Sequence, residues 1–446
     1  MPRVTAHAVV DLAAEFGFQS QHITVLAGGD RRWVRCQLHG RLRAVSSVLV
    51  RVPENNLDHH VARLQPVQRS GNLQLHRLAH PDHPSAFTRQ RKLPLPALVA
   101  LMLSGMRKSI QSELDGFFAH LNNQAQLVRI VSEQAFAQAR AKLSLTAIPL
   151  PNDWVIERAE HYGFVPRWNG LRLVAADAST VRFGLRASHV KRAALADQIL
   201  FGLFLPGCEL MLAASLYSTR ESKRQMLFEH LDRLSRSDLL LLDRGYPGRW
   251  LVAALNQRPI AFCMRVEKSG NSGFTCVRDF LRSGLLEQVV TLRGAERRDV
   301  RDFECPSEPQ TVRLIRHIAP NGQVRVLMSN LFDVVRFPAC SVSDLYHQRW
   351  RIEEGFKRPK HRLNLEHGPG LSQQAVVQDV GAKVLCDNLQ ALTTLNAHHN
   401  ADLPEPVRIN RAYVHTALKP LLPALLLGKK VARSSSGSRA PPAPTP

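Results

Sequence analysis

The chain has 446 residues, enough for two or three domains with a substantial buried core. Lysine and arginine total 59 against 37 aspartate and glutamate residues, a formal net charge of +22, and this excess favours a polyanionic partner. No run reaches the roughly 18 apolar residues that span a bilayer, and the positive charge is spread along the chain, which argues against a membrane role. Charge alone leaves a ribosome-like or simply basic soluble protein open.

The cysteines bear on the compartment. The seven cysteines are widely spaced and include no Cys-x-x-Cys pair. We therefore expect neither a zinc site nor a disulfide framework, and we expect a reducing cytoplasm.

Residues 1–84 contain no motif that we can assign, and we treat them as an unassigned N-terminal extension. Gly28-Gly29-Asp30 is typical of a turn. The basic run Arg31–Arg35 is compatible with a strand or with a solvated edge, and we favour the solvated edge. The segment is either a divergent domain or translation from a start codon upstream of the real one.

The pattern becomes helical over residues 85–150. Apolar residues recur at helical spacing over Leu95–Met102 after a proline-rich start, and Ser109–Phe118 continues the pattern. Ser132 suits the N-cap of a helix over Glu133–Leu143. Basic residues in that helix are compatible with DNA contact and equally with a small structural bundle.

Residues 168–266 alternate strand-like and helix-like runs, which predicts an α/β sheet. The predicted strands are Arg172–Asp177, Ile199–Leu205, Leu210–Tyr217, Leu239–Leu242 and Ile260–Val266. The predicted helices are one that contains Met226, Leu227, His230, Leu231 and Leu234, and one over Trp250–Leu255.

Residues 267–332 are β-rich, and Asn321-Gly322 predicts the turn of a hairpin. Helices follow over Ser341–Leu363 and Leu385–Leu395. The tail, residues 433–446, is rich in Ser, Pro and Ala and is predicted to be disordered.

Three acidic residues stand in settings that suit metal chemistry. Asp177 and Asp243 each end an apolar run, so each carboxylate is predicted at the C-terminal end of a buried strand. Glu353 lies in the predicted helix after them. Three such carboxylates can hold two divalent cations, as in-line phosphodiester chemistry requires.

Four residues of that helix share one face. On an ideal helix, Tyr346, Arg349, Glu353 and Lys360 fall within a stripe about 60° wide. Pro359 directly precedes Lys360 and predicts a kink or an end of the helix there.

Each of these features also has a simpler structural interpretation. The helix stripe could be an exposed face of ion pairs. Asp243 could cap the Gly245-Tyr246-Pro247 turn, and Asp177 could cap a turn with Ser179 and Thr180. Because the three carboxylates occur as a set, we favour the functional interpretation.

The spacing Tyr346-x2-Arg349-x3-Glu353-x6-Lys360 resembles the signature of the IS4-type DDE transposases. The sequences Asp-Arg-Gly-Tyr-Pro around Asp243 and Ala-Ala-Asp-Ala-Ser-Thr around Asp177 resemble the other two motifs of that family. The resemblance runs from about residue 87 to about residue 395.

The resemblance implies an α/β fold with an RNase H-like catalytic core over residues 168–266 and 333–400. It also implies that residues 267–332 are a β-rich insertion and that residues 85–150 are a helical, DNA-binding domain.

The resemblance further implies two-metal-ion DNA cleavage at element ends and transfer of the 3′-hydroxyl into target DNA. Asp177, Asp243 and Glu353 would be catalytic and would bind Mg²⁺ or Mn²⁺, two ions in all. Carried over from the family, Tyr346, Arg349 and Lys360 would contact DNA phosphates.

Arg244 is a further candidate for a phosphate contact beside the metals. The expected partners are double-stranded DNA, both transposon ends and target, and a second copy of the chain, in the nucleoid of a bacterial cytoplasm.

Three functions remain to be distinguished. The first is an active cut-and-paste transposase, and the second is a catalytically decayed, transposase-derived protein that binds DNA without cutting it. The third is an RNase H-like nuclease without strand transfer. The complete acidic triad argues against the second, and the Tyr–Arg–Glu–Lys stripe argues against the third.

Overall fold

The computed structural model describes the backbones of three strands between residues 19 and 51, and most of the chain from residue 83 to residue 400. In and after this part of the chain, the structure does not describe residues 84, 88–90, 107, 123, 125, 185–192, 268–273, 319–321, 369 and 371, or any residue after 400 except 414 and 427. The predicted tail therefore lies outside the described residues. No helix in the described part is long and apolar enough to cross a membrane.

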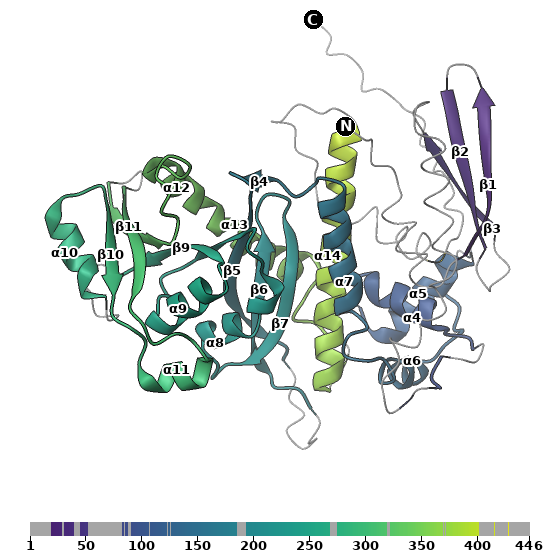
Figure 1. Ribbon diagram of the computed structural model, residues 1–446. Helices are drawn as coiled ribbons and strands as arrows, with labels where there is room; N and C mark the ends of the chain where they lie inside the picture. Colours follow the sequence, from purple (N-terminus) through teal and green to yellow (C-terminus); the bar gives the residue numbers. More distant parts are fainter. Residues whose placement is uncertain are drawn as a thin grey trace, which may run out of the picture.

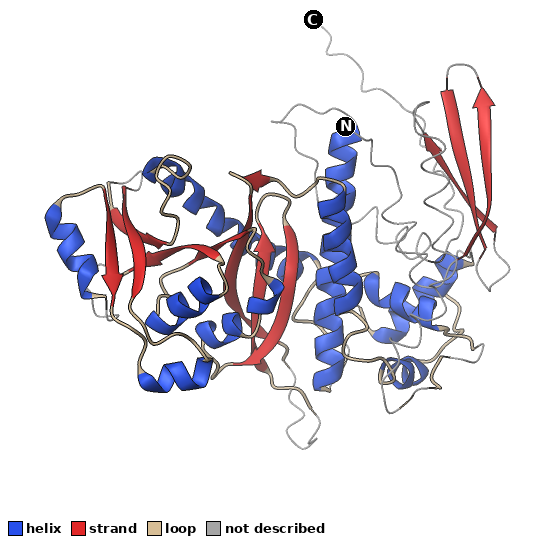
Figure 2. Cartoon of the chain, viewed as in Figure 1, coloured by secondary structure: helices blue, strands red, loops and turns tan. Residues whose placement is uncertain are grey.

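One mixed sheet dominates the described part of the chain (Figures 1 and 2). Its strands lie in the order β10-β11-β12-β9-β8-β5-β6-β7, and the short β4 pairs with β5. The strands are β4 (Arg167–Trp168), β5 (Leu171–Arg182), β6 (Asp197–Leu205), β7 (Leu210–Ser218), β8 (Asp238–Leu242), β9 (Ala261–Val266), β10 (Glu287–Leu292), β11 (Gln310–Ile318) and β12 (Val324–Ser329).

The first five long strands have the RNase H-like order. β5, β6 and β7 form an antiparallel meander, and β8 and β9 then add in parallel on the other side of β5. Parallel neighbours need a crossover connection. It is provided by α8 (Lys223–Phe228) and η4 (Leu231–Arg233) before β8, and by α9 (Arg249–Gln257) before β9. The predicted α/β, RNase H-like core is confirmed.

Alternate side chains of the central strand β8 enter two different cores. Leu240 and Leu242 pack with α8 and α9, whereas Leu239 and Leu241 pack with α12 (Ala339–Tyr346) and α13 (Arg351–Lys357). Successive side chains of a strand point to opposite faces. A strand covered by helices on both faces is therefore apolar at consecutive positions, as in this run.

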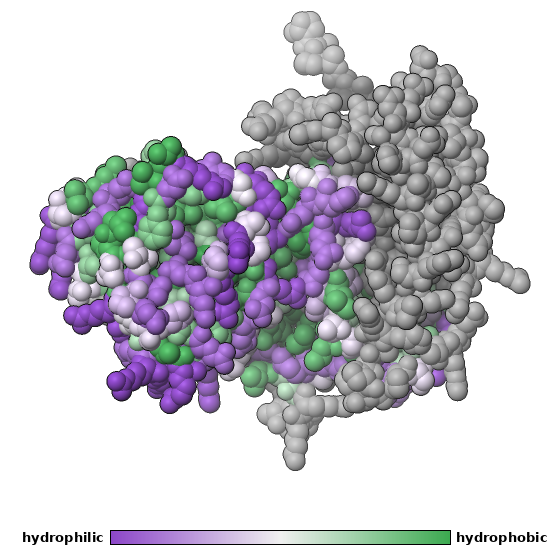
Figure 3. Space-filling model, viewed as in Figure 1, coloured by the Kyte–Doolittle hydropathy of each residue, from purple (hydrophilic) through white to green (hydrophobic). Residues whose placement is uncertain are grey.

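The predicted β-rich insertion continues this sheet. β12 pairs antiparallel with β9, β11 with β12, and β10 with β11. The predicted hairpin is confirmed by the pairing of Ile318 with Val324. The segment also contains two helices, α10 (Thr275–Ser283) and α11 (Arg297–Phe303). Hydrophilic side chains gather over the edge of the molecule where α11 lies (Figure 3).

Residues 95–161 form four helices: α4 (Leu95–Leu103), α5 (Ile110–Leu121), α6 (Glu133–Arg140) and α7 (Pro149–His161). Ser109 and Ser132 cap α5 and α6, since each hydroxyl accepts a hydrogen bond from the backbone N–H three residues later. α7 was not predicted. The helix α14 (Gln373–Asn400) is much longer than predicted, and it packs against β7, α4 and α7 (Figure 1).

Two helix predictions need correction. The helix predicted over residues 341–363 begins at Ala339 and changes type, from α12 through the 3₁₀ turn η5 (His347–Trp350) and α13 to the π turn η6 (Arg358–Arg362). The wider π turn accommodates Pro359, so the helix does not end there. The helix predicted around Met226 is shorter, because α8 ends at Phe228.

The N-terminal strands β1 (Gln19–Gly28), β2 (Arg31–His39) and β3 (Val45–Arg51) form a separate antiparallel sheet. The prediction of a solvated edge over Arg31–Arg35 is wrong, because this run begins the central strand β2. Trp33, for example, pairs with both Leu26 and Arg51. A β-strand is defined by hydrogen bonds between backbone groups of paired strands. The number of arginines in the run does not indicate whether these bonds form.

A buried ion pair fastens the N-terminal helices to α14. Arg140 Nη2 lies 2.6 Å from Asp379 Oδ1 and 2.7 Å from the Ala375 carbonyl oxygen, and Arg140 Nε donates to Gln378. Both charged side chains are at most 4 % exposed. Breaking such a pair from one side leaves an uncompensated buried charge.

We predict that Arg140→Met destabilises the protein by about 3–5 kcal/mol, seen as a lower midpoint in thermal denaturation. Arg129→Met removes an exposed arginine of the same region and should change the midpoint little. The double variant Arg140→Met/Asp379→Leu should recover most of the loss. A double variant no more stable than Arg140→Met would contradict the ion-pair explanation.

Candidate active site

Asp177 and Asp243 lie at the same level on neighbouring strands. β5 pairs in parallel with β8 from Arg172 opposite Asp238 to Ala175 opposite Leu241. Asp243 directly follows β8, but β5 runs on past Asp177 to Arg182 through its pairing with β6. The prediction that Asp177 ends its strand is therefore wrong. The register still places the two aspartates side by side, since each lies two residues beyond the last pair.

A lysine bridges the two aspartates. Lys223 Nζ lies 2.6 Å from Asp177 Oδ1 and 3.3 Å from Asp243 Oδ2. Lys223 is the first residue of α8, where the preceding Ser222 accepts a hydrogen bond from Gln225 N–H and caps the helix. Lys223 lies in none of the sequence motifs described above. Ser222 is a typical N-cap residue, so the sequence could have predicted a helix that begins at Lys223. Only the folded structure shows that Lys223 lies beside the two aspartates.

An arginine connects Asp177 to Glu353. Arg349 Nη1 lies 3.5 Å from Asp177 Oδ2, and Arg349 Nη2 lies 3.5 Å from Glu353 Oε1. The arginine side chain is only 5 % exposed, whereas that of Glu353 is 40 % exposed. The guanidinium also lies over the ring of Trp350, 4.4 Å from its centroid. The structure thus brings the three predicted carboxylates into one chain of ion pairs, Asp243–Lys223–Asp177–Arg349–Glu353.

The other predicted DNA-binding residues take different places. Tyr346 is buried and donates its hydroxyl hydrogen bond to the carbonyl of Leu242, 3.0 Å away. Lys360 Nζ lies 2.8 Å from Ser179 Oγ and also donates to the Thr180 carbonyl, on the strand that carries Asp177. Arg244 is exposed and pairs with Glu267 at 3.3 Å. Their phosphate contacts stay a prediction.

Two glycines let α13 approach the sheet closely. A Cβ added to Gly355 would lie 2.8 Å from the ring of Phe204, and a Cβ added to Gly202 would lie 2.9 Å from Met211 Sδ and 3.1 Å from the ring of Phe356. Gly202 pairs with Asp177 across β5 and β6. The absence of side chains at both positions therefore allows the helix that carries Glu353 to pack next to Asp177.

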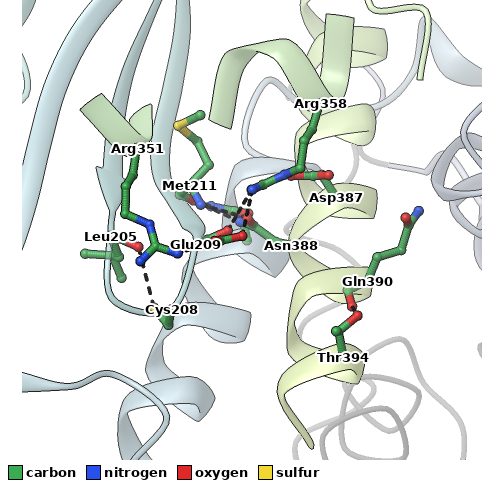
Figure 4. A network of polar contacts seen from close by, with 11 residues as sticks. Leu205, Cys208, Glu209, Met211, Arg351, Arg358, Asp387, Asn388, Gln390 and Thr394 are labelled. Carbon is green, nitrogen blue, oxygen red and sulfur yellow. Dashed lines mark hydrogen bonds and ion pairs between the residues drawn. The ribbon is translucent and has the colours of Figure 1, made fainter. Parts of the chain in front are cut away.

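The far side of the same helix is fastened by Glu209, in the turn between β6 and β7 (Figure 4). Glu209 pairs with Arg351 of α13 and lies 2.9 Å from Arg358 Nη1. Arg358 also lies 3.2 Å from Asp387 of α14. Glu209 has a φ of +59°, a conformation that costs a non-glycine residue energy. The ion pairs with both arginines give a reason for this strain, because they attach α13 and η6 to the turn between β6 and β7.

The charges of the site shift the pKa values of its neighbours. Burial by itself lowers the pKa of Lys223, but the hydrogen bond and charge of Asp177, with Asp243, raise it above its ordinary value overall. Burial raises the pKa of the Tyr246 hydroxyl, and the charges of Asp177 and Asp243 raise it further. Burial lowers the pKa of Lys360. Lys223 therefore stays positively charged at neutral pH.

The donor set fits a hard divalent cation such as Mg²⁺. Asp177, Asp243 and Glu353 offer carboxylate oxygens, the ligands that Mg²⁺ prefers. The ammonium of Lys223 already lies between the first two carboxylates, so that position accepts positive charge. Within the described residues, no three His, Cys, Asp or Glu side chains are close enough to hold a metal ion as they stand.

Comparison with known proteins identifies the domain that contains this site. The family model described as "Transposase DDE domain" matches residues 168–389, which span the sheet and all three carboxylates. Residues 168–389 are therefore a DDE transposase domain. The chain is 23 % identical over 286 residues to Transposase InsG for insertion sequence element IS4 of Escherichia coli (strain K12), covering 62 % of this chain and 63 % of that protein, and this similarity supports the IS4 type.

Among solved structures, the chain matches the cryo-EM structure of the piggyBac transposase synaptic complex with hairpin DNA. The match has a TM-score of 0.41 and 11 % sequence identity, and it covers 78 % of this chain and 76 % of that chain. This similarity is too distant to support an argument about the site of this DDE transposase.

We predict that Arg349→Ala lowers the free energy of unfolding by about 2 kcal/mol, because a buried guanidinium loses two carboxylate partners. Lys357→Ala is the matched control. It removes an exposed ion pair with Glu354 on the same helix, and such pairs contribute little. Thermal denaturation of both variants is the measurement, and equally small effects would contradict the bridging role of Arg349.

The same variant tests the predicted phosphate contact. If Arg349 also holds a DNA phosphate, Arg349→Ala should weaken binding to element ends and reduce the slope of log affinity against log salt by about one unit. Sequence preference should change little, because a phosphate contact does not read bases. An unchanged slope would show that Arg349 does not contact a DNA phosphate and serves only in the chain of ion pairs.

Proposed function

We propose that this DDE transposase catalyses cut-and-paste transposition. It would hydrolyse phosphodiester bonds at the ends of a DNA element and then join the 3′-hydroxyl ends to target DNA. The observation that supports the proposal is the gathering of Asp177, Asp243 and Glu353 from two strands and a helix by Lys223 and Arg349. A structural salt-bridge network would not need three acidic residues from three elements at one partly open edge of the sheet.

Each carboxylate has a defined part in this proposal. Asp177 and Asp243 supply oxygen ligands from the rigid sheet, and Glu353 supplies them from the helix. When bound, two Mg²⁺ or Mn²⁺ ions would supply activation of the attacking oxygen and stabilisation of the leaving oxygen. Arg349 orients Asp177 relative to Glu353. The ion pairs of Glu209 with Arg351 and Arg358 keep the helix in position against the sheet.

The proposed substrate is double-stranded DNA, bound by its phosphates around this edge. Lys360 of η6 contacts Ser179 and Thr180 on β5, the strand that carries Asp177. Arg244 follows Asp243 directly, and its side chain is 65 % exposed. The formal net charge of +22 would attract the DNA from a distance. We further propose that two copies of the chain act together, one at each element end.

We predict that binding and cleavage separate in Glu353→Gln. The change removes a ligand charge and little volume, so binding to duplexes that carry the inverted repeats flanking the gene should survive. Cleavage should be lost, by roughly 100-fold or more. Glu354→Gln is the matched control, because the Glu354 side chain is exposed and pairs with the exposed Lys357 on the same helix. EDTA should also abolish cleavage by the unaltered protein, and Mg²⁺ or Mn²⁺ should restore it.

The measurements are gel-shift titrations and single-turnover cleavage of the same labelled duplex. Near-normal cleavage by Glu353→Gln together with loss in Glu354→Gln would show that the glutamate is misassigned. Full cleavage in EDTA would overturn the metal-dependent mechanism. Tight binding with no cleavage by the unaltered protein under any metal condition would favour a decayed, DNA-binding relative.

A further inference from the structure

Lys223 occupies the space between the two strand aspartates. Its Nζ lies 2.6 Å from Asp177 Oδ1 and 3.3 Å from Asp243 Oδ2, and 6.0 Å from the centroid of the Tyr246 ring. We propose that Lys223 is an internal counter-ion that holds the place of a divalent cation in the metal-free protein and leaves it when the cation binds. This inference rests on the proposed function, since it concerns the metal site named there.

The chemistry of the site requires a cation between the aspartates. Two carboxylates brought together repel each other unless a positive charge lies between them. A lysine ammonium is a compact point charge with three donors, so it can serve both carboxylates at once. The same oxygens would be ligands of Mg²⁺, and an ammonium cannot remain between them beside a divalent cation because the two positive charges repel.

The anchoring of Lys223 suits a side chain that moves while its backbone stays. Its backbone is the first turn of α8, fixed by the Ser222 cap. Its side chain is 36 % exposed and reaches the aspartates through a flexible four-carbon stem. Arg349, the other cation of the site, is 5 % exposed. Lys223 can therefore swing into solvent, whereas Arg349 is held in place.

Gly245 keeps room around the bridge. A Cβ at this position would lie 3.1 Å from Asp243 Oδ1 and 3.8 Å from Lys223 Cδ. The Gly245 N–H also donates a hydrogen bond of 2.8 Å to Asp243 Oδ1, which fixes that carboxylate. The carboxylate thus stays in position while the lysine leaves, so the site is preorganised for the cation that replaces it.

The inference predicts two opposite effects of removing the charge. Without Lys223 the metal-free aspartates repel each other, so the metal-free protein should melt at a lower temperature. A divalent cation should then bind more tightly, because it no longer competes with the lysine. Lys223 acts here as a positioning residue, and a merely structural role would not tighten metal binding.

The test is Mn²⁺ binding to the full chain without DNA, measured from the electron paramagnetic resonance signal of free Mn²⁺. Lys223→Met should bind Mn²⁺ about tenfold more tightly than the unaltered protein. Lys357→Met, which removes a lysine from α13 outside the site, should bind as the unaltered protein does. Lys223→Gln, which keeps a donor for Asp177 but no charge, serves the same test if Lys223→Met does not fold.

The outcomes separate this inference from the proposed function. Asp177→Asn should abolish the Mn²⁺ binding in the unaltered and the Lys223→Met backgrounds. Mn²⁺ binding that depends on Asp177 but is equal or weaker in both Lys223 variants would overturn the inference and leave the proposed function standing. Absence of any Asp177-dependent Mn²⁺ binding in every variant would contradict both.

Discussion

The site contains three negatively charged side chains close together in a partly buried position, those of Asp177, Asp243 and Glu353. Their mutual repulsion must be offset by positive charge if the folded protein is to keep them there. Lys223 and Arg349 supply that offset through a continuous chain of ion pairs. The two cations differ in freedom, since the arginine is buried and the lysine is partly exposed. Arg349 is therefore fixed in the site, whereas Lys223 can be replaced by another cation.

The surrounding structure sets the positions of these charges. The parallel register of β5 and β8 places two aspartates at one level, and the buried hydroxyl of Tyr346 ties the helix segment to the end of β8. Gly202 and Gly355 allow that segment to lie close to the sheet, and Glu209 holds it from the opposite side. The helix changes type on both sides of α13, to the 3₁₀ turn η5 before it and the π turn η6 after it.

Much of this core could be predicted from the sequence. The apolar runs of β6, β7, β8 and β9 give strands near their observed bounds, because strands buried on both faces are continuously apolar. The same patterns could not show that β5 continues past Asp177, since Ser179, Thr180 and Arg182 interrupt the apolar run and the pairing of β5 with β6 is non-local. α7 was missed because it contains two prolines and little helical periodicity.

The three carboxylates of the site and Arg349 could be predicted from the sequence, but Lys223 could not. The ends of two apolar runs and the spacing within a helix select Asp177, Asp243 and Glu353, because such motifs are local in the sequence. Lys223 and Glu209 reach the site only through tertiary packing, from a helix start and a strand turn with no distinctive pattern. Tyr346 shared the helix stripe in an ideal projection, but the 3₁₀ turn η5 interrupts the helix directly after it, and its side chain is buried.

The central claim is that Asp243 binds a catalytic metal ion, and changing the softness of this ligand tests it most directly. Asp243→Cys replaces a hard oxygen by a thiolate, which binds Mg²⁺ poorly and binds softer ions better. We predict that this variant cleaves element ends poorly in Mg²⁺ and regains activity in Mn²⁺ or Cd²⁺, whereas Asp243→Ala regains none. Equal rescue of both variants, or undiminished cleavage by Asp243→Cys in Mg²⁺, would contradict the assignment.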